Sequence, residues 1–406
     1  MSDVSGIYEL ADATADSGSG VGVPPFDEAR LDELLAERGI DVVFATSLHN
    51  VQYLLGGYRF FMYGLLDAIG LSRYLPVLVY PRGRTDAALY VGAGNEDWGT
   101  DVDELWVGAV RNVAWTSAHA VTVAAERARD LGLEGSTIGI ERAYVPAEAI
   151  DALRAALPDA RFVWADEALE ELRAVKSPGE LELITTASTG VVDAMLATFA
   201  GAGVGDSKAE IAERLRREET FRGLTFDYCL IAAGVSVNRA PSSQRLAGGE
   251  ILSLDSGAHR RGYVADLTRM GIAGEPTARH QEFLAEVDAV QQAARTVARA
   301  GTRGGDLFDA AEEAMAGLPD RQAMSFLAHG CGLVTHEAPK LTATGSPPYP
   351  ATHAELPLRE GMVLSIETHL AHETVGFVKL EDTVIVRDGH AEAVGDHGRG
   401  WNRIDA

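Results

Sequence analysis

The first part of the chain alternates between helical and extended patterns of apolar residues. An apolar stripe predicts a helix that ends at Gly39 and buries Ala29, Leu31, Leu34 and Leu35. Apolar runs predict buried strands, with helices between them, at 40–45, 78–80, 87–91 and 137–140. Strands that alternate with helices are typical of an α/β domain, which we expect over residues 26–170.

Two changes of pattern divide the chain further. Residues 1–25 are rich in Gly, Ser, Asp and Ala, and this composition predicts a flexible N-terminal segment. Ser177, Pro178 and Glu180 form a helix start, with a serine cap, a proline at the first helical position and a glutamate at the third. We expect a second domain to begin near this point and to occupy residues 171–406.

The second domain carries a weak internal repeat. A long helix with a stripe of apolar residues is followed by a glycine-rich turn and a helix at 207–219. One hundred positions later a similar turn precedes a helix at 307–316. The repeat predicts a domain in which helices and strands occur twice, although common turn and capping chemistry also produces such matches by chance.

Two pairs of predicted strands carry carboxylates. Alternating positions predict the first pair at 250–255 and 262–269, joined by a loop that contains Gly257. Asp255 and Asp266 lie eleven positions apart in this pair, so an antiparallel hairpin can bring both to one face. Like charges at such a separation repel unless a cation lies between them.

The second pair of strands is predicted at 362–369 and 377–386. It offers Glu367 and Glu381 at hairpin spacing, and the preceding segment adds His329 and His336. Four carboxylates and one imidazole suit two divalent ions such as Mn, Co, Fe or Zn, and a water shared by two such ions becomes a hydroxide near neutral pH. Each residue alone also has an ordinary interpretation, as a turn former or a solvated strand residue.

Composition and charge mainly exclude certain partners and classes of protein. The chain of 406 residues has 35 basic and 60 acidic residues and a formal net charge of −25. Nucleic acids and anionic membranes require a cationic face, so we expect neither as a partner. We expect no membrane span and no signal peptide. The two cysteines, Cys229 and Cys331, argue against a disulfide scaffold and favour a cytoplasmic location, with Cys331 as a small buried residue.

The motifs resemble, in their order, the M24 peptidase family of creatinase, aminopeptidase P and prolidase. The resemblance implies an α/β N-terminal creatinase-like domain and an α+β catalytic domain with the pita-bread fold and a pseudo-twofold internal repeat. The segments that carry it are GIDVVFATSLHNVQYLLGG (39–57), LRAVKSPGELELI (172–184), LDSGAHRRGYVADLTR (254–269), HGCGLVTHEAP (329–339), EGMVLSIETHL (360–370) and VKLEDTVIV (378–386).

The resemblance also implies a cofactor and a ligand set. Two divalent metal ions are expected, manganese first, with cobalt, iron or zinc as alternatives. Glu367 would also accept a proton from the bridging water, and His336 would be the second, substrate-facing histidine. Asp266 and Glu381 would bridge the two ions, Asp255 would be a ligand of one of them, and His329 and Glu367 would be ligands of the other. The full set of implied ligands is Asp255, Asp266, His329, Glu367 and Glu381.

Three departures from the family pattern concern the substrate. Asn238 aligns where peptidases of the family carry a histidine, and asparagine cannot titrate near neutral pH. Thr368 and His369 replace a Pro-Gly pair, and Lys379 replaces an arginine, which weakens bidentate carboxylate recognition. We expect Asn238, His336 and Lys379 to contact the substrate, while His369 and His372 either line the pocket or are ordinary loop residues.

The leading hypothesis is hydrolysis of a peptide bond, of the Xaa-Pro aminopeptidase or dipeptidase type. The second is hydrolysis of another C–N bond in a small metabolite, as in ectoine hydrolase or creatinase, and Asn238 favours it. A lyase resembling the dimethylsulfoniopropionate lyases and a non-catalytic binding protein are further alternatives. The resemblance also implies a homodimer, in which Phe60, Phe61 and Tyr63 either cap the partner's pocket or belong to the core.

Overall fold

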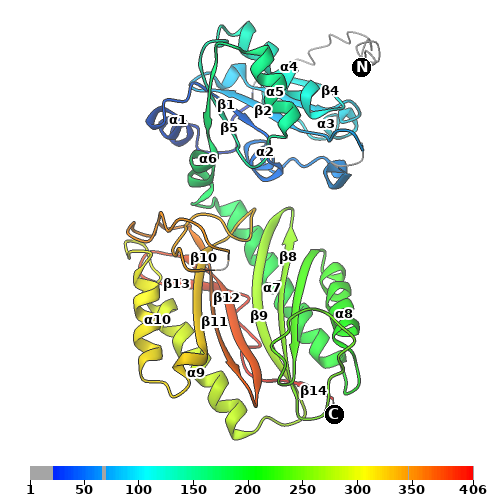
Figure 1. Ribbon diagram of the computed structural model, residues 1–406, viewed down its shortest axis with the longest axis vertical. Coiled ribbons are helices and arrows are strands. Elements are labelled where there is room, and N and C mark those ends of the chain that lie inside the picture. Colours follow the sequence, from blue (N-terminus) through cyan, green and yellow to red (C-terminus); the bar gives the residue numbers. More distant parts are fainter. Residues whose placement is uncertain (1–21, 66–69, 346, 406) are drawn as a thin grey trace. The chain divides into compact units, whose positions relative to one another are not determined.

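A computed structural model of the chain describes residues 22–65, 70–345 and 347–405 (Figure 1). The chain divides between Leu172 and Arg173 into two compact units. Most of the segment expected to be flexible, 1–25, lies outside the described residues. Within the part that is described, the backbone N–H of Gly22 donates a hydrogen bond to the carbonyl of Trp106 at 3.0 Å.

The first unit is built on a mixed six-stranded sheet in the order β4-β3-β2-β1-β5-β6. Its strands are β1 (Val42–Ala45), β2 (Val77–Pro81), β3 (Leu89–Ala93), β4 (Ala109–Ala114), β5 (Thr137–Ile140) and β6 (Arg161–Trp164). Its helices are α1 (Glu28–Glu37), α2 (Leu48–Leu54), α3 (Asp97–Thr100), α4 (Ser117–Asp130), α5 (Ala147–Ala156) and α6 (Asp166–Arg173), with short 3-10 turns at Phe61–Leu65 and Thr85–Ala87.

The α/β class expected for this unit is confirmed, and the local signals explain most of it. Asp27 caps α1 by accepting a hydrogen bond from the Arg30 N–H, and Gly39 has the positive φ of +62° that a helix end requires. β4 and β6 gave no sequence signal because most of their side chains are only partly buried. Phe60 and Tyr63 belong to the core, whereas Phe61 is 70% exposed.

The second unit contains an eight-stranded sheet whose main path runs β10-β11-β12-β9-β8-β7, with β13 beside β12 and β14 beside β9. Its strands are β7 (Thr225–Ala233), β8 (Ile251–Arg260), β9 (Tyr263–Ala273), β10 (Met324–Gly330), β11 (Val363–His372), β12 (Gly376–Val386), β13 (Ala391–Val394) and β14 (Asn402–Ile404). Its helices are α7 (Pro178–Gly201), α8 (Lys208–Phe221), α9 (Ala278–Val297) and α10 (Asp306–Ala316), with a 3-10 turn at Arg321–Ala323.

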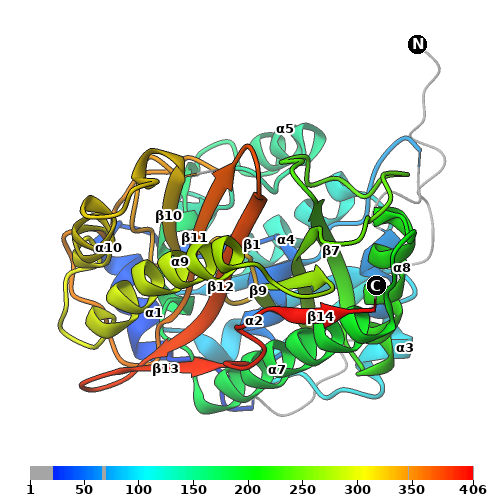
Figure 2. The ribbon, with the colours of Figure 1, turned by 90° about the horizontal axis from the view of Figure 1, so that it is seen from below.

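The expected repeat of the second unit is confirmed. Two helices followed by three strands occur first as α7-α8-β7-β8-β9 and again as α9-α10-β10-β11-β12. Helix α7 packs on β8 and β9, and α9 packs on β11 and β12 (Figure 2). The two halves meet where β9 pairs with β12, so residues of both repeats come together at the centre of one sheet.

Helix α7 begins with the predicted cap, in which Ser177 and Glu180 satisfy each other's backbone N–H groups. Among the helices of the described residues, α7 alone has the length and apolar composition of a membrane span. Its stripe residues Ile184, Val191 and Phe199 are buried against the sheet, as in the core helix of a globular unit.

The predicted loop at Gly257 is wrong. β8 continues to Arg260, and the hairpin turns at Arg261 and Gly262, both of which have positive φ. A Cβ at Gly257 would lie 2.3 Å from the aromatic ring of Tyr228 on the neighbouring strand β7. The glycine therefore permits a close approach between strands rather than a turn.

A buried acid lies between α8 and the sheet. The Ser256 hydroxyl is 2.9 Å from Glu219 Oε1 and 2.7 Å from the carbonyl oxygen of Tyr228. Because this hydroxyl has one proton and the carbonyl can only accept it, a protonated Glu219 completes the chain of hydrogen bonds. Burial accordingly raises the pKa of Glu219 to about 8.

The raised pKa of Glu219 predicts a pH-dependent stability. As pH rises from about 4.5 towards 8, the unfolded chain ionises this carboxyl while the folded chain does not, so stability is lost over this interval. Glu219→Gln should therefore raise the free energy of unfolding by roughly 2 kcal/mol or more at pH 8, and by much less at pH 5. Urea unfolding at pH 5 and pH 8 measures the free energy of unfolding, with the neighbouring Glu218→Gln as control. An equal change in this free energy at both pH values would contradict the prediction.

Candidate metal centre

The hairpin β8–β9 places two aspartates on one face of the sheet. Asp255 pairs with Thr268, and Gly257 pairs with Asp266, so the two carboxylates are offset by two residues along the hairpin. Since side chains two residues apart share a face, Asp255 and Asp266 point to the same side, and both are buried.

The hairpin β11–β12 brings the acids of the second repeat to the same place. Glu367 and Glu381 pair directly across it. Glu381 also pairs with Thr268 of β9, which joins it to the first hairpin. His329 lies on β10, opposite Ser365 and therefore on the same side of β11 as Glu367. Acids from both repeats thus meet at the centre of the sheet.

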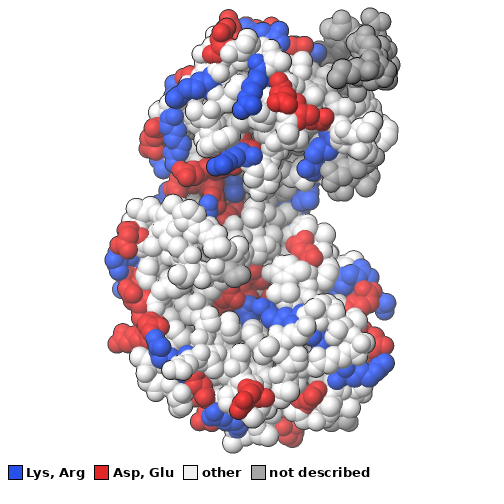
Figure 3. Space-filling model, in the orientation of Figure 1, with Lys and Arg blue, Asp and Glu red and all other residues white. Residues whose placement is uncertain are grey.

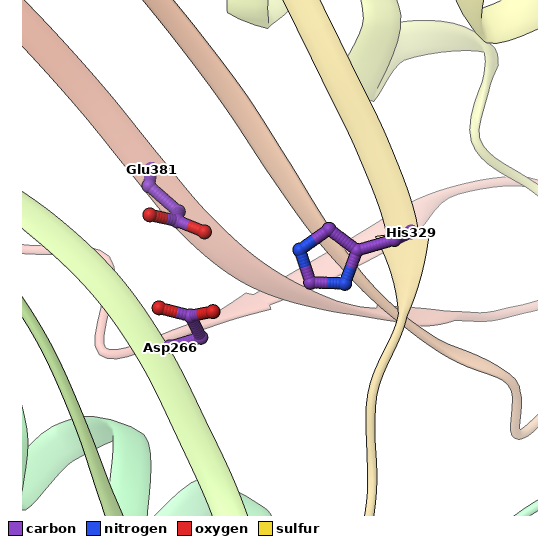
Figure 4. Close-up of side chains that lie close together, drawn as sticks. All are labelled: Asp266, His329 and Glu381. Carbon is purple, nitrogen blue, oxygen red and sulfur yellow. The ribbon is translucent and has the colours of Figure 1, made fainter. Parts of the chain in front are cut away.

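Three of the side chains converge on one point (Figure 4). Asp266, His329 and Glu381 each have a ligand atom within 4.8 Å of the other two, and all three are buried. The Nδ1 atom of His329 lies 3.2 Å from the carbonyl of Gly330, which fixes it as the protonated nitrogen. His329 Nε2 is buried and has no hydrogen-bond partner among the described residues. An unpaired imidazole nitrogen facing two carboxylates fits a divalent metal ion.

The other two expected ligands, Asp255 and Glu367, contact a lysine side chain. Lys379 Nζ lies 2.6 Å from Asp255 Oδ2, 2.5 Å from Glu367 Oε2 and 2.9 Å from Glu381 Oε2. The Arg239 guanidinium also contacts Asp255. Lys379, which was expected to contact substrate, has its ammonium buried among these carboxylates.

The electrostatics of the cluster favour a bound cation. Burial, together with Glu381 and Asp255, raises the pKa of Asp266 well above its usual range. Burial and the Glu381 carboxylate raise the pKa of Glu367 to about 7, against the opposing effect of Lys379. These shifts reflect the cost of holding several like charges out of water, and a divalent ion between the carboxylates removes that cost.

Neighbouring hydroxyls fix the carboxylates. Tyr228 donates to Asp266 Oδ1 at 2.5 Å, and Glu381 accepts from Ser365 at 2.7 Å and from Thr268 at 3.0 Å. Sequence reasoning missed Tyr228 and Arg239. Tyr228 follows a shift of register between β7 and β8 that turns its ring toward Asp266, and no short motif reveals such a shift.

The loop that carries His336 is held by a buried ion pair. Glu337 Oε2 is 3.1 Å from Arg173 Nη2, and Glu337 Oε1 is 3.0 Å from Lys176 Nζ. The His336 ring stacks on that of His329 with a centroid distance of 3.7 Å, and its Nδ1 has no hydrogen-bond partner in the described part of the chain. Burial and the adjacent His329 lower the pKa of His336 to about 4, so its imidazole is neutral at pH 7.

The remaining candidates lie around this centre or away from it. Asn238 is exposed, and its Oδ1 accepts a hydrogen bond from the Ala240 N–H within its own loop. His369 pairs with Lys379 across the hairpin, on the face that carries Glu367. His372 lies on the opposite face, with its ring 5.0 Å from that of Phe283. In the view of Figure 3, acidic and basic residues lie side by side in a hollow on the surface of the second unit.

Cys331 is fully buried in the core of the second unit, as expected of a small apolar residue. Burial raises the pKa of its thiol to about 12, so it is not a thiolate near neutral pH.

Two family models match the chain. Metallopeptidase family M24 matches residues 182–388, about half of the chain, and this segment contains all of the candidate ligands. The Creatinase/Prolidase N-terminal domain matches residues 29–175.

Individual relatives agree with these models. The chain is 24% identical over 370 residues to an Xaa-Pro dipeptidase of Pyrococcus horikoshii, covering 88% of this chain and 93% of the relative. An Xaa-Pro dipeptidase structure from Bacillus anthracis superposes with a TM-score of 0.78 at 21% identity, covering 93% of this chain and 99% of that one. An X-Pro aminopeptidase structure from Thermotoga maritima superposes with a TM-score of 0.73 at 22% sequence identity, and it covers the same shares of the two chains. At these identities the structures show the fold, which is the expected pita-bread architecture.

The convergence of Asp266 with His329 and Glu381 predicts that this aspartate is needed for metal binding. Asp266→Asn keeps the shape but removes one negative charge, so Mn(II) affinity should fall at least about 100-fold. Equilibrium dialysis followed by elemental analysis measures the change. The control is Asp193→Asn, which should leave metal content unchanged, because Asp193 lies on α7 and its Oδ1 is 2.8 Å from Nε2 of His397 rather than in the cluster. Full metal content in Asp266→Asn would remove this residue from the site.

Proposed function

Because the chain belongs to metallopeptidase family M24 and is therefore a metal-dependent hydrolase, we propose that its substrates are short peptides with proline after the cleaved bond. Relatives named Xaa-Pro dipeptidase, matched over nearly their full length, support this substrate class. The proposal covers dipeptides and slightly longer peptides, since relatives of both the dipeptidase and the aminopeptidase type share the fold.

The observation that carries the proposal is the convergence of Asp266, His329 and Glu381 on one buried point, with the Nε2 of the histidine unpaired. We assign Asp255 and Glu367 to the same centre, with Asp255 as a ligand of one ion and Glu367 with His329 as ligands of the other. Manganese is the first choice of metal, because a set of carboxylates with one imidazole suits it. When bound, a pair of such ions supplies a nucleophile at neutral pH and polarises the carbonyl that is attacked.

Two side chains are placed to handle protons. Glu367 pairs with Glu381 across the hairpin, so its carboxylate faces the position of a nucleophile held at this centre. The neutral His336 imidazole has an unpaired Nδ1, so it can hydrogen-bond the substrate beside the metal centre. We assign proton transfer to Glu367 and to His336, and substrate orientation to His336 as well.

One observation favours a second candidate, hydrolysis of a C–N bond in a small metabolite. Asn238, aligned with a histidine of the family's peptidases, bonds to its own loop, while its neighbour Arg239 reaches Asp255. A different set of groups therefore faces the substrate on this side of the centre. A small substrate with its own anionic group would suit the added guanidinium.

Release of amino acids from a panel of Xaa-Pro dipeptides and tripeptides tests the two candidates directly. We expect release that requires added Mn(II) and is abolished by chelation. The matched control is the same panel with alanine in place of proline. If the metal-loaded protein releases nothing from any peptide, the peptidase proposal fails and the small-metabolite candidate takes its place.

His336→Ala separates orientation from metal binding. Because His336 stacks on His329 but is outside the converging trio, metal content should stay intact while turnover falls by about 10²–10⁴. Parallel measurement of bound metal and of kcat distinguishes the roles. Loss of metal in this variant would make His336 a ligand and contradict the assignment.

A further inference from the structure

The loop between β7 and β8 carries an arginine at the edge of the metal centre. Nη2 of Arg239 contacts Asp255, and the guanidinium carbon lies 5.0 Å from the ring centroid of Phe377. Phe377 and Lys379 are two residues apart on β12, so this ring lies on the face of the sheet that carries the centre. The guanidinium therefore extends from the centre to an aromatic side chain beside it.

The backbone of this loop is fixed on both sides of the arginine. The carbonyl of Arg239 accepts a hydrogen bond from the Ile231 N–H at 2.7 Å. The carbonyl of Asn238 accepts one at 2.6 Å from Nζ of Lys208, a buried residue at the start of α8, and Asn238 Oδ1 accepts one from the Ala240 N–H. Because its backbone is already ordered, the arginine loses little conformational freedom when a ligand binds.

The two cations at Asp255 differ in what they can still bind. The ammonium of Lys379 has three N–H donors, is buried, and lies within 2.9 Å of three carboxylates. The guanidinium of Arg239 has five N–H donors and, in the described part of the chain, makes one hydrogen bond, to Asp255. The Arg239 side chain is also 29% exposed. Arg239 therefore keeps donors that a bound molecule can reach.

A guanidinium in this position suits a carboxylate. Its planar fork of donors matches the two carboxylate oxygens, and contact with the face of Phe377 holds that plane without using a donor. Because Arg239 contacts Asp255 itself, a carboxylate bound at its free edge lies close to the bond that the centre cleaves. In an Xaa-Pro dipeptide the residue directly after that bond ends in a carboxylate, whereas a longer peptide has an uncharged amide there.

We propose that Arg239 makes this chain select dipeptides, by binding the carboxylate of the residue that follows the cleaved bond. The inference rests on the peptidase function proposed above and narrows its substrates from short peptides to dipeptides. The guanidinium keeps Asp255 as one partner and takes the carboxylate as the second. A dipeptide amide or a tripeptide leaves these donors without an anion, so it binds less tightly.

A binding measurement without turnover tests this subsite. The ligand is Ala-Pro with a methylene in place of the peptide carbonyl, which cannot be hydrolysed, and it is compared with its C-terminal amide. Both are titrated into Mn(II)-loaded protein and followed by calorimetry. We expect the acid to bind at least about tenfold more tightly than the amide, a typical effect of a hydrogen bond between charged groups. Equal binding of the two, or no binding of the acid, would overturn the inference without any variant.

Arg239→Gln removes the charge and the fork of donors. The preference for the acid should disappear, because the acid binds about 10- to 100-fold more weakly while the amide is unchanged. Arg239→Lys should keep part of the preference, since it keeps the charge but loses the planar fork. The matched control is Arg245→Gln in the same loop, whose guanidinium contacts the Gly205 carbonyl and Glu210 instead, and it should change neither affinity. Bound Mn(II) is measured in each variant, and affinities are compared at equal metal content.

A preference for the acid that persists in Arg239→Gln would overturn the inference, as would equal kcat/KM of the wild type for Ala-Pro and Ala-Pro-Ala. Hydrolysis is measured separately, so the two proposals fail independently. Hydrolysis of Xaa-Pro dipeptides with a KM that does not depend on Arg239 rejects this inference alone. Acid-selective binding that depends on Arg239, without hydrolysis of any peptide, supports the carboxylate subsite and rejects the peptidase function.

Discussion

The second unit depends on keeping several like charges together in a place from which water is largely excluded. Asp255, Asp266 and Glu381 are almost fully buried, and Glu367 is nearly so. Burial of one unpaired carboxylate is already costly, and the cost grows when others lie within a few ångströms. Cations therefore decide whether this centre is stable: the ammonium of Lys379, the guanidinium of Arg239, and the divalent ions that the family implies.

Much of the surrounding structure holds the backbone of this centre in place. Arg269 is completely buried, and its guanidinium donates to the carbonyls of Thr268 and Glu381, across the junction of β9 and β12. It also pairs with Asp382 at 3.0 Å. Because the guanidinium also donates to the carbonyls of His397 and Gly395, it fixes the register at which the two repeats meet. On the other side of the centre, Glu337 with its two cations anchors the loop that presents His336.

The charge of the centre also depends on residues outside the expected ligand set. In this chain two cations lie against Asp255, one from the strand that carries Glu381 and one from the loop after β7. Asn238 bonds within its own loop, and the His369 imidazole lies opposite Lys379 across the hairpin. The charge around Asp255 is therefore set by residues from two different segments of the second unit.

Local signals in the sequence predicted the α/β pattern of the first unit, the internal repeat and the two hairpins with carboxylates, and the family resemblance implied the full fold and the ligand set. Capping residues such as Ser177 and Gly39 mark helix ends, and the period of two in each hairpin places Asp255 with Asp266 and Glu367 with Glu381. Strands with partly exposed faces, such as β4 and β6, lacked this periodic signal. Gly257 was misread as a turn because a glycine that admits a neighbouring ring looks the same in sequence.

Only the tertiary structure decided which groups share the centre. Lys379 and Asp255 are 124 positions apart, and Arg239 lies in a loop whose contact with Asp255 follows no motif. The sequence by itself determined the residue types and the strands that carry them. The pairing of β9 with β12 decided that a lysine, and not only metal ions, lies among the carboxylates. The physical reason is that such contacts depend on strand register and on side-chain reach between distant segments, which local spacing does not encode.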